Sequence, residues 1–315
     1  MLNLISNISY LIILKVLKLA LYLPLFIIFF FCLSKPSWAE EDLFQERSLR
    51  TGIYLQSFPD ISLQDMQTAM QYWTQEIAEY SGIKGQVYFY KDLQRMRTDF
   101  YRGKINFILT SPLNIINHFD LQQFSDGYLS VMYGTPTDQL VVLSGKNSGI
   151  NNMTDCKGKH LTLLNNDPVS EMYADILMLQ AFGKPAKSIF KKIEYIHKSN
   201  QQILKLFFKT TDVILAYKNF YALASELNPQ IKATTQIIAT LDGMPRGMGL
   251  FHKNVPVDFR EQVLSILFTL DTHIKGRQLL TMFYSDKLIR ANIDALAPVL
   301  RLKQQYLQLL KQRSK

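Results

Sequence analysis

Short apolar segments typical of β-strands alternate with amphipathic segments typical of α-helices along most of this chain. Residues 86–90 (QVYFY), 105–109 (INFIL), 139–144 (QLVVLS) and 160–164 (HLTLL) are nearly continuous apolar runs. Such strands are typical of sheets that are buried on both faces, because the helices in the connections cover them. The alternation therefore predicts an α/β fold in which mostly parallel sheets are flanked by helices.

The clearest helix is expected over residues 62–80. Ser62 can cap its first turn, and Gly82 can end it because glycine adopts the left-handed conformation readily. Its apolar residues recur at helical spacing, namely Met66, Met70, Trp73 and Ile77. Further strands are expected over 50–55, 192–196, 212–217 and 248–252, with an extended segment over 231–240. Further helices are expected over 93–101, 199–208, 256–273 and 275–284, and from about 291 onward.

The alternation comes in two runs, joined near Pro136 and again near Arg246. We therefore expect two lobes with two crossing segments. The first lobe would comprise residues 48–136 and 246–292, and the second residues 137–245. A basic C-terminal helix would follow over 293–315. Ligands of open α/β sheets bind beyond the carboxyl ends of the strands, so the expected site lies between the lobes.

The first 39 residues are typical of a secretory signal peptide. Lys15 and Lys18 precede an uncharged apolar run over 19–33, and Ser37-Trp38-Ala39 has small residues where a signal peptidase cuts. Cleavage would release a chain that begins at Glu40. The alternative is an uncleaved anchor over residues 10–33 that tethers the protein to a membrane.

Charge and cysteine content exclude several classes of protein. The formal net charge is +9, and three of the positive charges are lysines of the first 39 residues. The remaining surplus is spread along the chain except in the tail over 301–315, so nucleic-acid binding is not expected. Cys156 is the one cysteine after the signal segment, and it sits in a polar turn without a histidine partner in sequence. The five histidines lack metal-ligand spacing, so we do not expect a metal site. We also expect no other cofactor, and we expect a monomer.

One segment resembles a known family. Residues 139–164 (QLVVLSGKNSGINNMTDCKGKHLTLL) contain Ser148-Gly149-Ile150 and Lys157-Gly158-Lys159 between two apolar strands. This order resembles type II periplasmic solute-binding proteins of ABC transporters. Residues 275–280 (KGRQLL) resemble the late helix of the phosphate/phosphonate-binding, PhnD-like branch. The resemblance implies a two-lobed type II fold, a periplasmic location and a membrane permease as partner.

The expected pocket departs from the pattern of that branch. The resemblance implies a helix start rich in Ser and Thr after residues 160–164, where hydroxyls and backbone amides hold an anion. Here that stretch is 166–171 (NDPVSE), in which only Ser170 keeps a hydroxyl and Asp167 and Glu171 add negative charge. The phosphonate ligand is therefore not carried over, and Glu171 would favour an amine-bearing solute if it contacted the ligand.

Nine residues are candidates for ligand binding because they lie at strand ends, helix starts or crossings that face the expected cleft. A hydroxyl or aromatic ring there can bind a solute, but it can also cap a helix or fill the core. Arg246 could clamp a carboxylate or phosphate, or lie on the hinge surface. The nine candidates are Tyr54, Ser57, Thr110, Ser111, Tyr133, Ser170, Ser199, Tyr217 and Arg246.

The leading hypothesis is an exported protein that captures a small solute, with anions among the candidates, for an ABC uptake system. The alternative is a periplasmic sensor or accessory protein of the same fold that signals to a membrane partner. An enzyme is not expected, because no nucleophile and base or paired carboxylates are in evidence in the sequence. The sequence does not identify the ligand.

Overall fold

The computed structural model describes residues 43–58 and 61–313. The expected signal peptide, residues 1–39, lies outside the described residues, and so does Cys32. Within the described part of the chain, every helix is too short or too polar to cross a bilayer. The segment from Phe44 onward forms one compact unit that contains two sheets.

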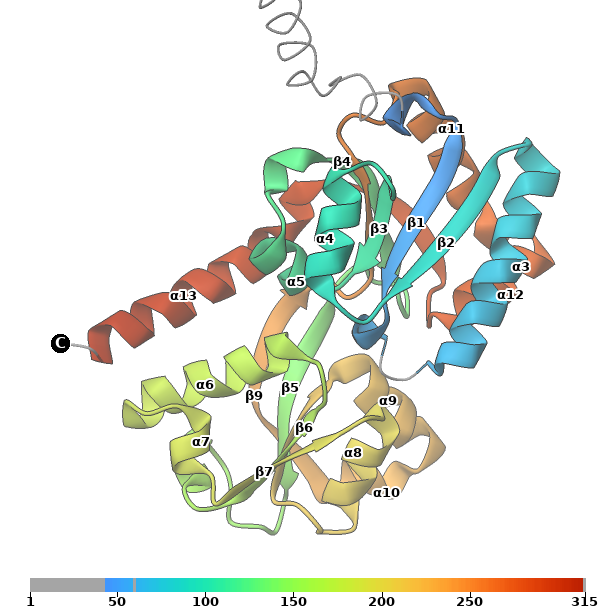
Figure 1. Cartoon of the computed structure of the whole chain (residues 1–315). Coiled ribbons are helices and arrows are strands. Elements are labelled where there is room, and N and C mark those ends of the chain that lie inside the picture. The colour runs from blue at the N-terminus through green and yellow to red at the C-terminus, as the bar shows by residue number, and fades with distance from the viewer. Residues whose placement is uncertain (1–42, 59–60, 314–315) are drawn as a thin grey trace, which may run out of the picture. The chain divides into compact units, whose positions relative to one another are not determined.

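The first sheet has six strands in the order β11-β4-β10-β3-β1-β2 (Figure 1). Its strands come from both ends of the chain. They are β1 (Ser48–Tyr54), β2 (Lys84–Tyr90), β3 (Phe107–Thr110), β4 (Phe124–Val131), β10 (Met248–His252) and β11 (Lys287–Ala291).

The second sheet has five strands in the order β7-β6-β8-β5-β9, all from the middle of the chain. They are β5 (Asp138–Gly145), β6 (His160–Leu164), β7 (Lys192–Ile196), β8 (Val213–Tyr217) and β9 (Thr235–Met244). The chain passes from the first sheet to the second between β4 and β5, and returns between β9 and β10. The lobe boundaries given above stay a prediction, although each crossing falls close to one of them.

Both sheets are mixed, which revises the expectation of mostly parallel sheets. In the first sheet β1 pairs in parallel with β2 and β3, but β10 runs antiparallel to β3 and β4. In the second sheet β6 pairs in parallel with β7 and β8, but β5 runs antiparallel to β8 and β9. The strands β4, β10, β5 and β9 adjoin the crossings. The chain leaves the first sheet after β4 and returns to it at β10, and it enters the second sheet at β5 and leaves it after β9. The α/β fold with helix-flanked sheets is otherwise confirmed.

Helices cover both faces of each sheet (Figure 1). Around the first sheet lie α3 (Leu63–Ser81), α4 (Leu93–Tyr101), α5 (Pro112–His118), α11 (Val257–Leu267) and α12 (Ile274–Met282). Around the second lie α6 (Pro168–Phe182), α7 (Ala186–Ile189), α8 (Ser199–Phe207), α9 (Lys218–Leu227) and α10 (Pro229–Thr234). Short 3-10 turns occur at η1 (Leu55–Ser57), η2 (Leu121–Gln123), η3 (Met153–Cys156), η4 (Leu270–Thr272) and η5 (Ile293–Leu296).

Local signals explain why α3 forms where the sequence predicts it. The Ser62 hydroxyl accepts a hydrogen bond from the Asp65 N–H at 3.1 Å, which satisfies one of the free amides of the first turn. Gly82 ends the helix with φ 69°, a conformation that costs glycine little. Met66, Met70 and Trp73 are buried and join the core beside the first sheet.

Apolar clusters lie on both faces of each sheet, as nearly continuous apolar strands require. In the first sheet, Phe107 and Phe251 belong to the cluster that includes α3 and α11, whereas Ile108 and Leu250 belong to the cluster that includes α4. In the second sheet, alternate residues of β5 divide between two clusters in the same way. This alternation follows from the two-residue period of a strand.

The structure differs from the sequence prediction in three segments. The helix expected over 256–273 ends at Leu267, where α11 stops, and η4 follows it. Residues 231–240 are not wholly extended: α10 occupies the first part, because Asn228 caps it and Pro229 suits its first turn. The last helix does not begin near 291, because β11 runs as an edge strand beside β4 and η5 follows it. Edge strands of five residues with charged ends carry a weak sequence signal.

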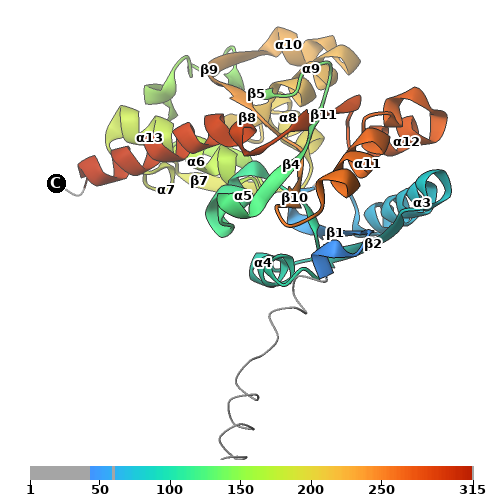
Figure 2. The same ribbon diagram turned by 90° about the horizontal axis from the view of Figure 1, so that it is seen from above.

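The last helix, α13 (Ala297–Arg313), contacts elements of both sheets (Figure 2). Leu296, just before it, is buried in a cluster of the first sheet, whereas Val299 and Leu302 are buried in a cluster of the second. Farther along, the Tyr306 hydroxyl donates to the Asp175 carboxylate of α6 at 3.0 Å. The helix is therefore held by both halves of the compact unit.

Candidate functional site

Loops that follow strands of both sheets line a cavity of about 540 Å³, which we call the cleft cavity. From the first sheet come Tyr54, Gln56 and Asn114, and from the second come Asn165, Asn166 and Glu171. Parallel strands end at the same edge of a sheet, so their loops gather there. The cleft cavity therefore lies where an open α/β sheet usually binds its ligand.

The charged residues of the cleft cavity have both signs. Lys91 lines it together with Asp92 and Glu171, and the polar ring of His118 lines it as well. Burial raises the pKa of the Glu171 carboxyl, and the nearby carboxylates of Asp167 and Asp175 raise it further. The wall is rich in amides and mixed in charge, so it is suited to hydrogen bonding rather than to a strongly anionic ligand.

A hydrogen-bonded group, which we call the hydroxyl cluster, adjoins the cleft cavity on the side of the first sheet. Its members are Ser57, Thr110, Ser111 and Asn114. The Ser57 hydroxyl lies 3.1 Å from that of Thr110 and accepts the Ser111 backbone N–H at 3.1 Å. The Asn114 amide donates to the Thr110 hydroxyl at 3.1 Å, and α5 places it one turn after Thr110. The Ser111 hydroxyl is buried and has no hydrogen-bond partner among the described residues.

The corresponding position in the second sheet is already occupied by a carboxylate of the chain. Asp167 caps α6: its carboxylate accepts the Ser170 backbone N–H at 3.3 Å and the Ser170 hydroxyl at 2.5 Å. The Tyr217 hydroxyl also donates to Asp167, at 3.2 Å. Asp167, Ser170 and Tyr217 are all buried. Since helix N-termini attract anions, Asp167 fills the place where an anionic ligand would bind this helix.

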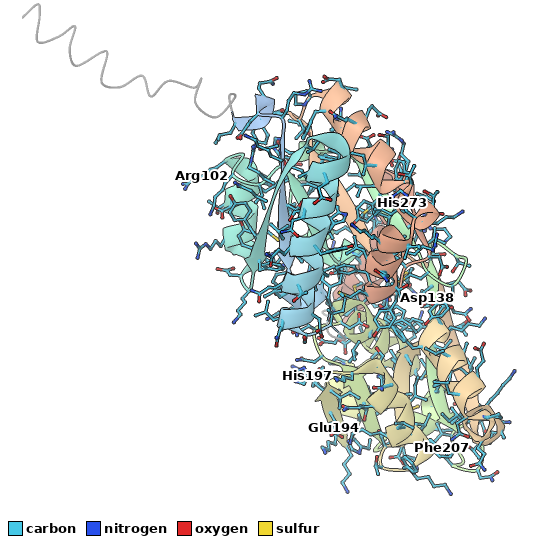
Figure 3. The ribbon with its side chains drawn as sticks, turned by 90° about the vertical axis from the view of Figure 1, so that its right-hand side faces the viewer. Arg102, Asp138, Glu194, His197, Phe207 and His273 are labelled. Carbon is cyan, nitrogen blue, oxygen red and sulfur yellow. The ribbon has the colours of Figure 1, made fainter. Side chains whose placement is uncertain are left out.

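Arg246 lies in the crossing between β9 and β10. The central carbon of its guanidinium is 3.4 Å from the centre of the Tyr217 ring and 5.3 Å from that of Phe220, at cation–π distances. Its Nη1 is buried without a hydrogen-bond partner among the residues that the structure describes. Burial raises the pKa of the Asp138 carboxyl and the charge of Arg246 opposes that shift. Figure 3 labels Asp138 where the chain enters the second sheet.

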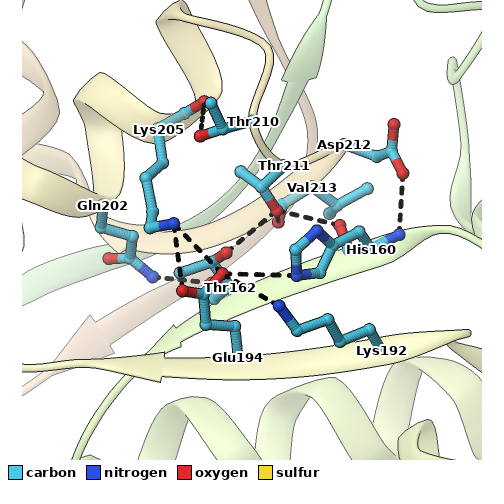
Figure 4. Close-up of polar contacts among 10 residues, drawn as sticks. All are labelled: His160, Thr162, Lys192, Glu194, Gln202, Lys205, Thr210, Thr211, Asp212 and Val213. Carbon is cyan, nitrogen blue, oxygen red and sulfur yellow. Dashed lines mark hydrogen bonds and ion pairs between the residues drawn. The ribbon is translucent and has the colours of Figure 1, made fainter.

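A second polar network lies at the opposite end of the second sheet (Figure 4). The Thr162 and Thr211 hydroxyls are 2.9 Å apart, and the Asp212 carboxylate accepts the His160 backbone N–H at 2.8 Å. Lys205 pairs with Glu194 at 3.0 Å. His160 begins β6, and Thr211 and Asp212 precede β8, so this network lies at the amino ends of the strands. It stabilises the sheet and is remote from the cleft cavity.

No group of three or more His, Cys, Asp or Glu side chains in the described part of the chain could hold a metal ion. The Cys156 thiol is fully buried, and burial raises its pKa to about 12, so thiolate chemistry is suppressed. The polar groups at the cleft cavity are suited to binding.

A family model of the periplasmic substrate-binding proteins of phosphonate ABC transporters matches residues 56–296. The chain belongs to this family. The match spans the hydroxyl cluster, Asp167 and Arg246, and every lining residue of the cleft cavity except Tyr54. No curated protein matches the sequence.

Solved structures support the type II periplasmic binding protein fold. A binding protein component of an ABC phosphonate transporter from Pseudomonas aeruginosa has a TM-score of 0.60 at 12% identity, over 84% of this chain and 88% of that chain. PhnD1 of Prochlorococcus marinus, solved with methylphosphonate, has a TM-score of 0.59 at 14% identity, over 82% and 98%. XAC2383 of Xanthomonas citri, solved with ATP, has a TM-score of 0.60 at 12% identity, over 84% and 99%. At these identities the likeness shows the fold alone.

The structure brings most of the nine candidate residues into two groups. Ser57, Thr110 and Ser111 meet in the hydroxyl cluster, and Tyr54 lines the cleft cavity, where its hydroxyl donates to Gln56 at 2.6 Å. The second group is Ser170, Tyr217 and Arg246, which are linked through Asp167 and the Tyr217 ring. Their roles in ligand binding stay predictions.

Tyr133 and Ser199 are not part of either group. Tyr133 is exposed in the turn after β4, where its backbone has φ 50°, and Ser199 is buried at the start of α8. The amide side chains of the cleft cavity, above all Asn114 and Asn165, were not among the nine candidates. Asn114 could have been found from its spacing, because it follows Thr110 by one helical turn.

Proposed function

We propose that this protein captures a small solute in the cleft cavity and delivers it to an ABC permease. The observation that carries this proposal is the cavity of about 540 Å³ whose wall combines strand-end loops of both sheets. Because each sheet contributes part of the wall, a bound solute would favour the arrangement in which both halves contact it. The periplasm is the proposed location, in keeping with the family.

The cleft favours a solute with at most one negative charge. Asp167 already neutralises the start of α6, and Glu171 and Asp92 add negative charge to the cavity wall. A phosphonate dianion would approach these carboxylates with little compensation. Arg246 does not line the cleft cavity, but it lies in the adjacent crossing and its Nη1 is buried without a hydrogen-bond partner among the described residues, so it can balance a single anionic group that reaches the crossing.

A thermal-shift screen of the protein from Glu40 onward tests the proposal. The panel would contain phosphate, methylphosphonate, small carboxylates, amines and vitamins. A solute at 100 times its Kd adds about 2.7 kcal/mol of stability, which raises Tm by roughly 5 °C or more. If no solute on the panel raises Tm, the transport hypothesis loses its support.

A pair of asparagine variants localises the site. Asn114→Ala removes an amide from the cleft wall and should weaken binding of the selected solute about tenfold in calorimetry. Asn151→Ala is the matched control, because Asn151 is exposed and its side-chain oxygen accepts from the amide of Gln236 in β9, outside the wall of the cleft cavity. Equal losses in both variants would place the solute elsewhere.

The comparisons give no support to the alternative of a periplasmic sensor. Capture from a membrane fraction separates the two functions. The transport hypothesis expects a permease in the captured material, whereas a sensor would bring down a kinase or another receptor.

A further inference from the structure

A second cavity, of about 110 Å³, lies beneath the first sheet, between its strands and the helices α3 and α12. We call it the apolar cavity. Most of its wall is hydrocarbon, including Met70, Leu267, Leu270, Leu280 and Phe283. An engineered cavity of roughly 150 Å³ with such a lining stays dry and binds benzene, so this one suits an apolar group of about four to six carbons.

Three unpaired hydrogen-bond donors belong to the wall of this apolar cavity. Trp73 and Ser285 are 5% and 6% exposed, yet the Trp73 indole N–H and the Ser285 hydroxyl have no partner among the described residues. The Nη1 of Arg246 is the third. Buried donors without acceptors are costly, so an acceptor from outside the chain would be stabilised at this wall.

The apolar cavity connects to the groups assigned to solute capture. Ser57 lines it and also belongs to the hydroxyl cluster, whose Asn114 lines the cleft cavity. Arg246 lies in the crossing between the sheets, so the cation is at the border of this cavity rather than deep within the first sheet. A charged group at Ser57 and Arg246 would place the rest of a ligand against the hydrocarbon wall.

A helix beside the second sheet completes the wall of the apolar cavity. Phe220 of α9 lines the apolar cavity and meets the Tyr284 ring edge to face, with ring centres 5.4 Å apart. Tyr284 follows α12 and has φ 55°, a strained backbone conformation for a bulky residue. This pair of rings joins the part of the unit around the second sheet to the part around the first sheet. Separating these two parts would therefore open the apolar cavity.

We propose that the solute is a small organic monoanion with an apolar body, such as an aliphatic carboxylate, and that this body occupies the apolar cavity. The charged group binds at Arg246 and Ser57, and its oxygens supply the missing acceptors. This inference rests on the proposed function of solute capture. It narrows the solute to one class and moves the main contacts of that solute from the cleft cavity to the adjoining apolar cavity.

Tryptophan fluorescence tests the inference directly. The chain from Glu40 onward has Trp73 as its one tryptophan, because the other is Trp38. Pentanoate should change the Trp73 emission with saturation, and it should bind on the order of 50-fold more tightly than acetate, because each buried methylene adds roughly fourfold. Pentylamine and pentan-1-ol, which lack the negative charge, should bind at least tenfold more weakly than pentanoate.

Variants test whether the solute binds in the apolar cavity or only in the cleft cavity. Arg246→Met and Ser285→Ala should each weaken pentanoate binding in calorimetry, about tenfold or more for the arginine. Arg102→Met, an exposed arginine at the end of α4, is the matched control and should have no effect. Trp73→Phe keeps the aromatic wall but removes the N–H, so it tests the indole donor alone.

The outcomes distinguish this inference from the proposed function. If another solute binds without changing the Trp73 emission, capture stands and the assignment of the apolar cavity is overturned. Equal affinity for acetate and pentanoate also overturns it, as does unaltered pentanoate binding by the Arg246 variant. If no solute binds, both proposals fail together.

Discussion

The guanidinium of Arg246 lies 3.4 Å from the centre of the Tyr217 ring, at the point where the chain returns from the second sheet to the first. The hydroxyl of the same tyrosine donates to Asp167, which caps α6. A residue of the crossing is thereby linked to the start of a helix that borders the cleft cavity. The link joins a cation and a carboxylate through one aromatic side chain.

Replacing Tyr217 by Phe keeps the ring beneath Arg246 but removes the hydrogen bond to Asp167. Because Asp167 is buried, losing one donor should lower the free energy of unfolding by about 1–3 kcal/mol in urea denaturation. Tyr306→Phe is the matched control, since it removes a half-buried phenol from Asp175 and should cost less. Equal costs would mean that the Asp167 contact adds no particular stability.

His252 makes stability depend on pH. It is 3% exposed, its ring stacks on Phe44 with centres 4.2 Å apart, and burial lowers its pKa to about 4. Between this value and its ordinary value near 6.5, the unfolded chain binds a proton that the folded chain does not. Its contribution is therefore complete above about pH 6.5 and is lost as the pH falls toward 4.

A variant of His252 separates its contribution to the pH dependence of stability from the contribution of the carboxylates. His252→Gln lowers stability at pH 7.5, but its urea midpoint should fall less than that of the native protein between pH 7 and pH 4.5. The native slope has an upper limit of about 1.4 kcal/mol per pH unit from this residue. Parallel pH profiles for the two proteins would show that His252 does not titrate in this range.

Much of the fold could be predicted from the sequence, because local signals and tertiary packing agree. The strand over 160–164 and the helix over 93–101 have the predicted bounds. Gly149 and Gly158 of the family-like segment both have φ 74°, a conformation that glycine adopts readily. The direction of strand pairing was less predictable, because it depends on how the two crossings connect the sheets. The short edge strand β11 carried too weak a pattern to be recognised.

The candidate site could be predicted only in part. Ser57, Thr110 and Ser111 stand at strand ends, which the alternation of strands and helices indicates. The sequence also showed that Asp167 brings negative charge to the start of α6, but not that the carboxylate bonds this helix and Tyr217. The apolar cavity was not foreseen, because its wall combines α3, α12 and the crossing, which are far apart in sequence.

Cys156 should be inert in the folded protein. Its thiol is fully buried and its raised pKa keeps it protonated, so labelling by a disulfide reagent at pH 8 should be slow and should accelerate in urea. Cys156→Ser should leave solute binding unchanged. Rapid labelling of the native protein, or loss of binding in the serine variant, would contradict the assignment of Cys156 to the core.

Asp167→Asn tests whether the carboxylate at α6 keeps multiply charged anions out. Asparagine caps helices about as well as aspartate, so the start of α6 should remain intact while one negative charge disappears. Methylphosphonate and phosphate should then bind at least tenfold more tightly than to the native protein in calorimetry, and the gain should shrink as salt is added. Asp155→Asn, at an exposed capping turn of η3, controls for the change in net charge. If that variant gains as much affinity, or if Asp167→Asn gains none, the Asp167 carboxylate does not decide which anions the cleft accepts.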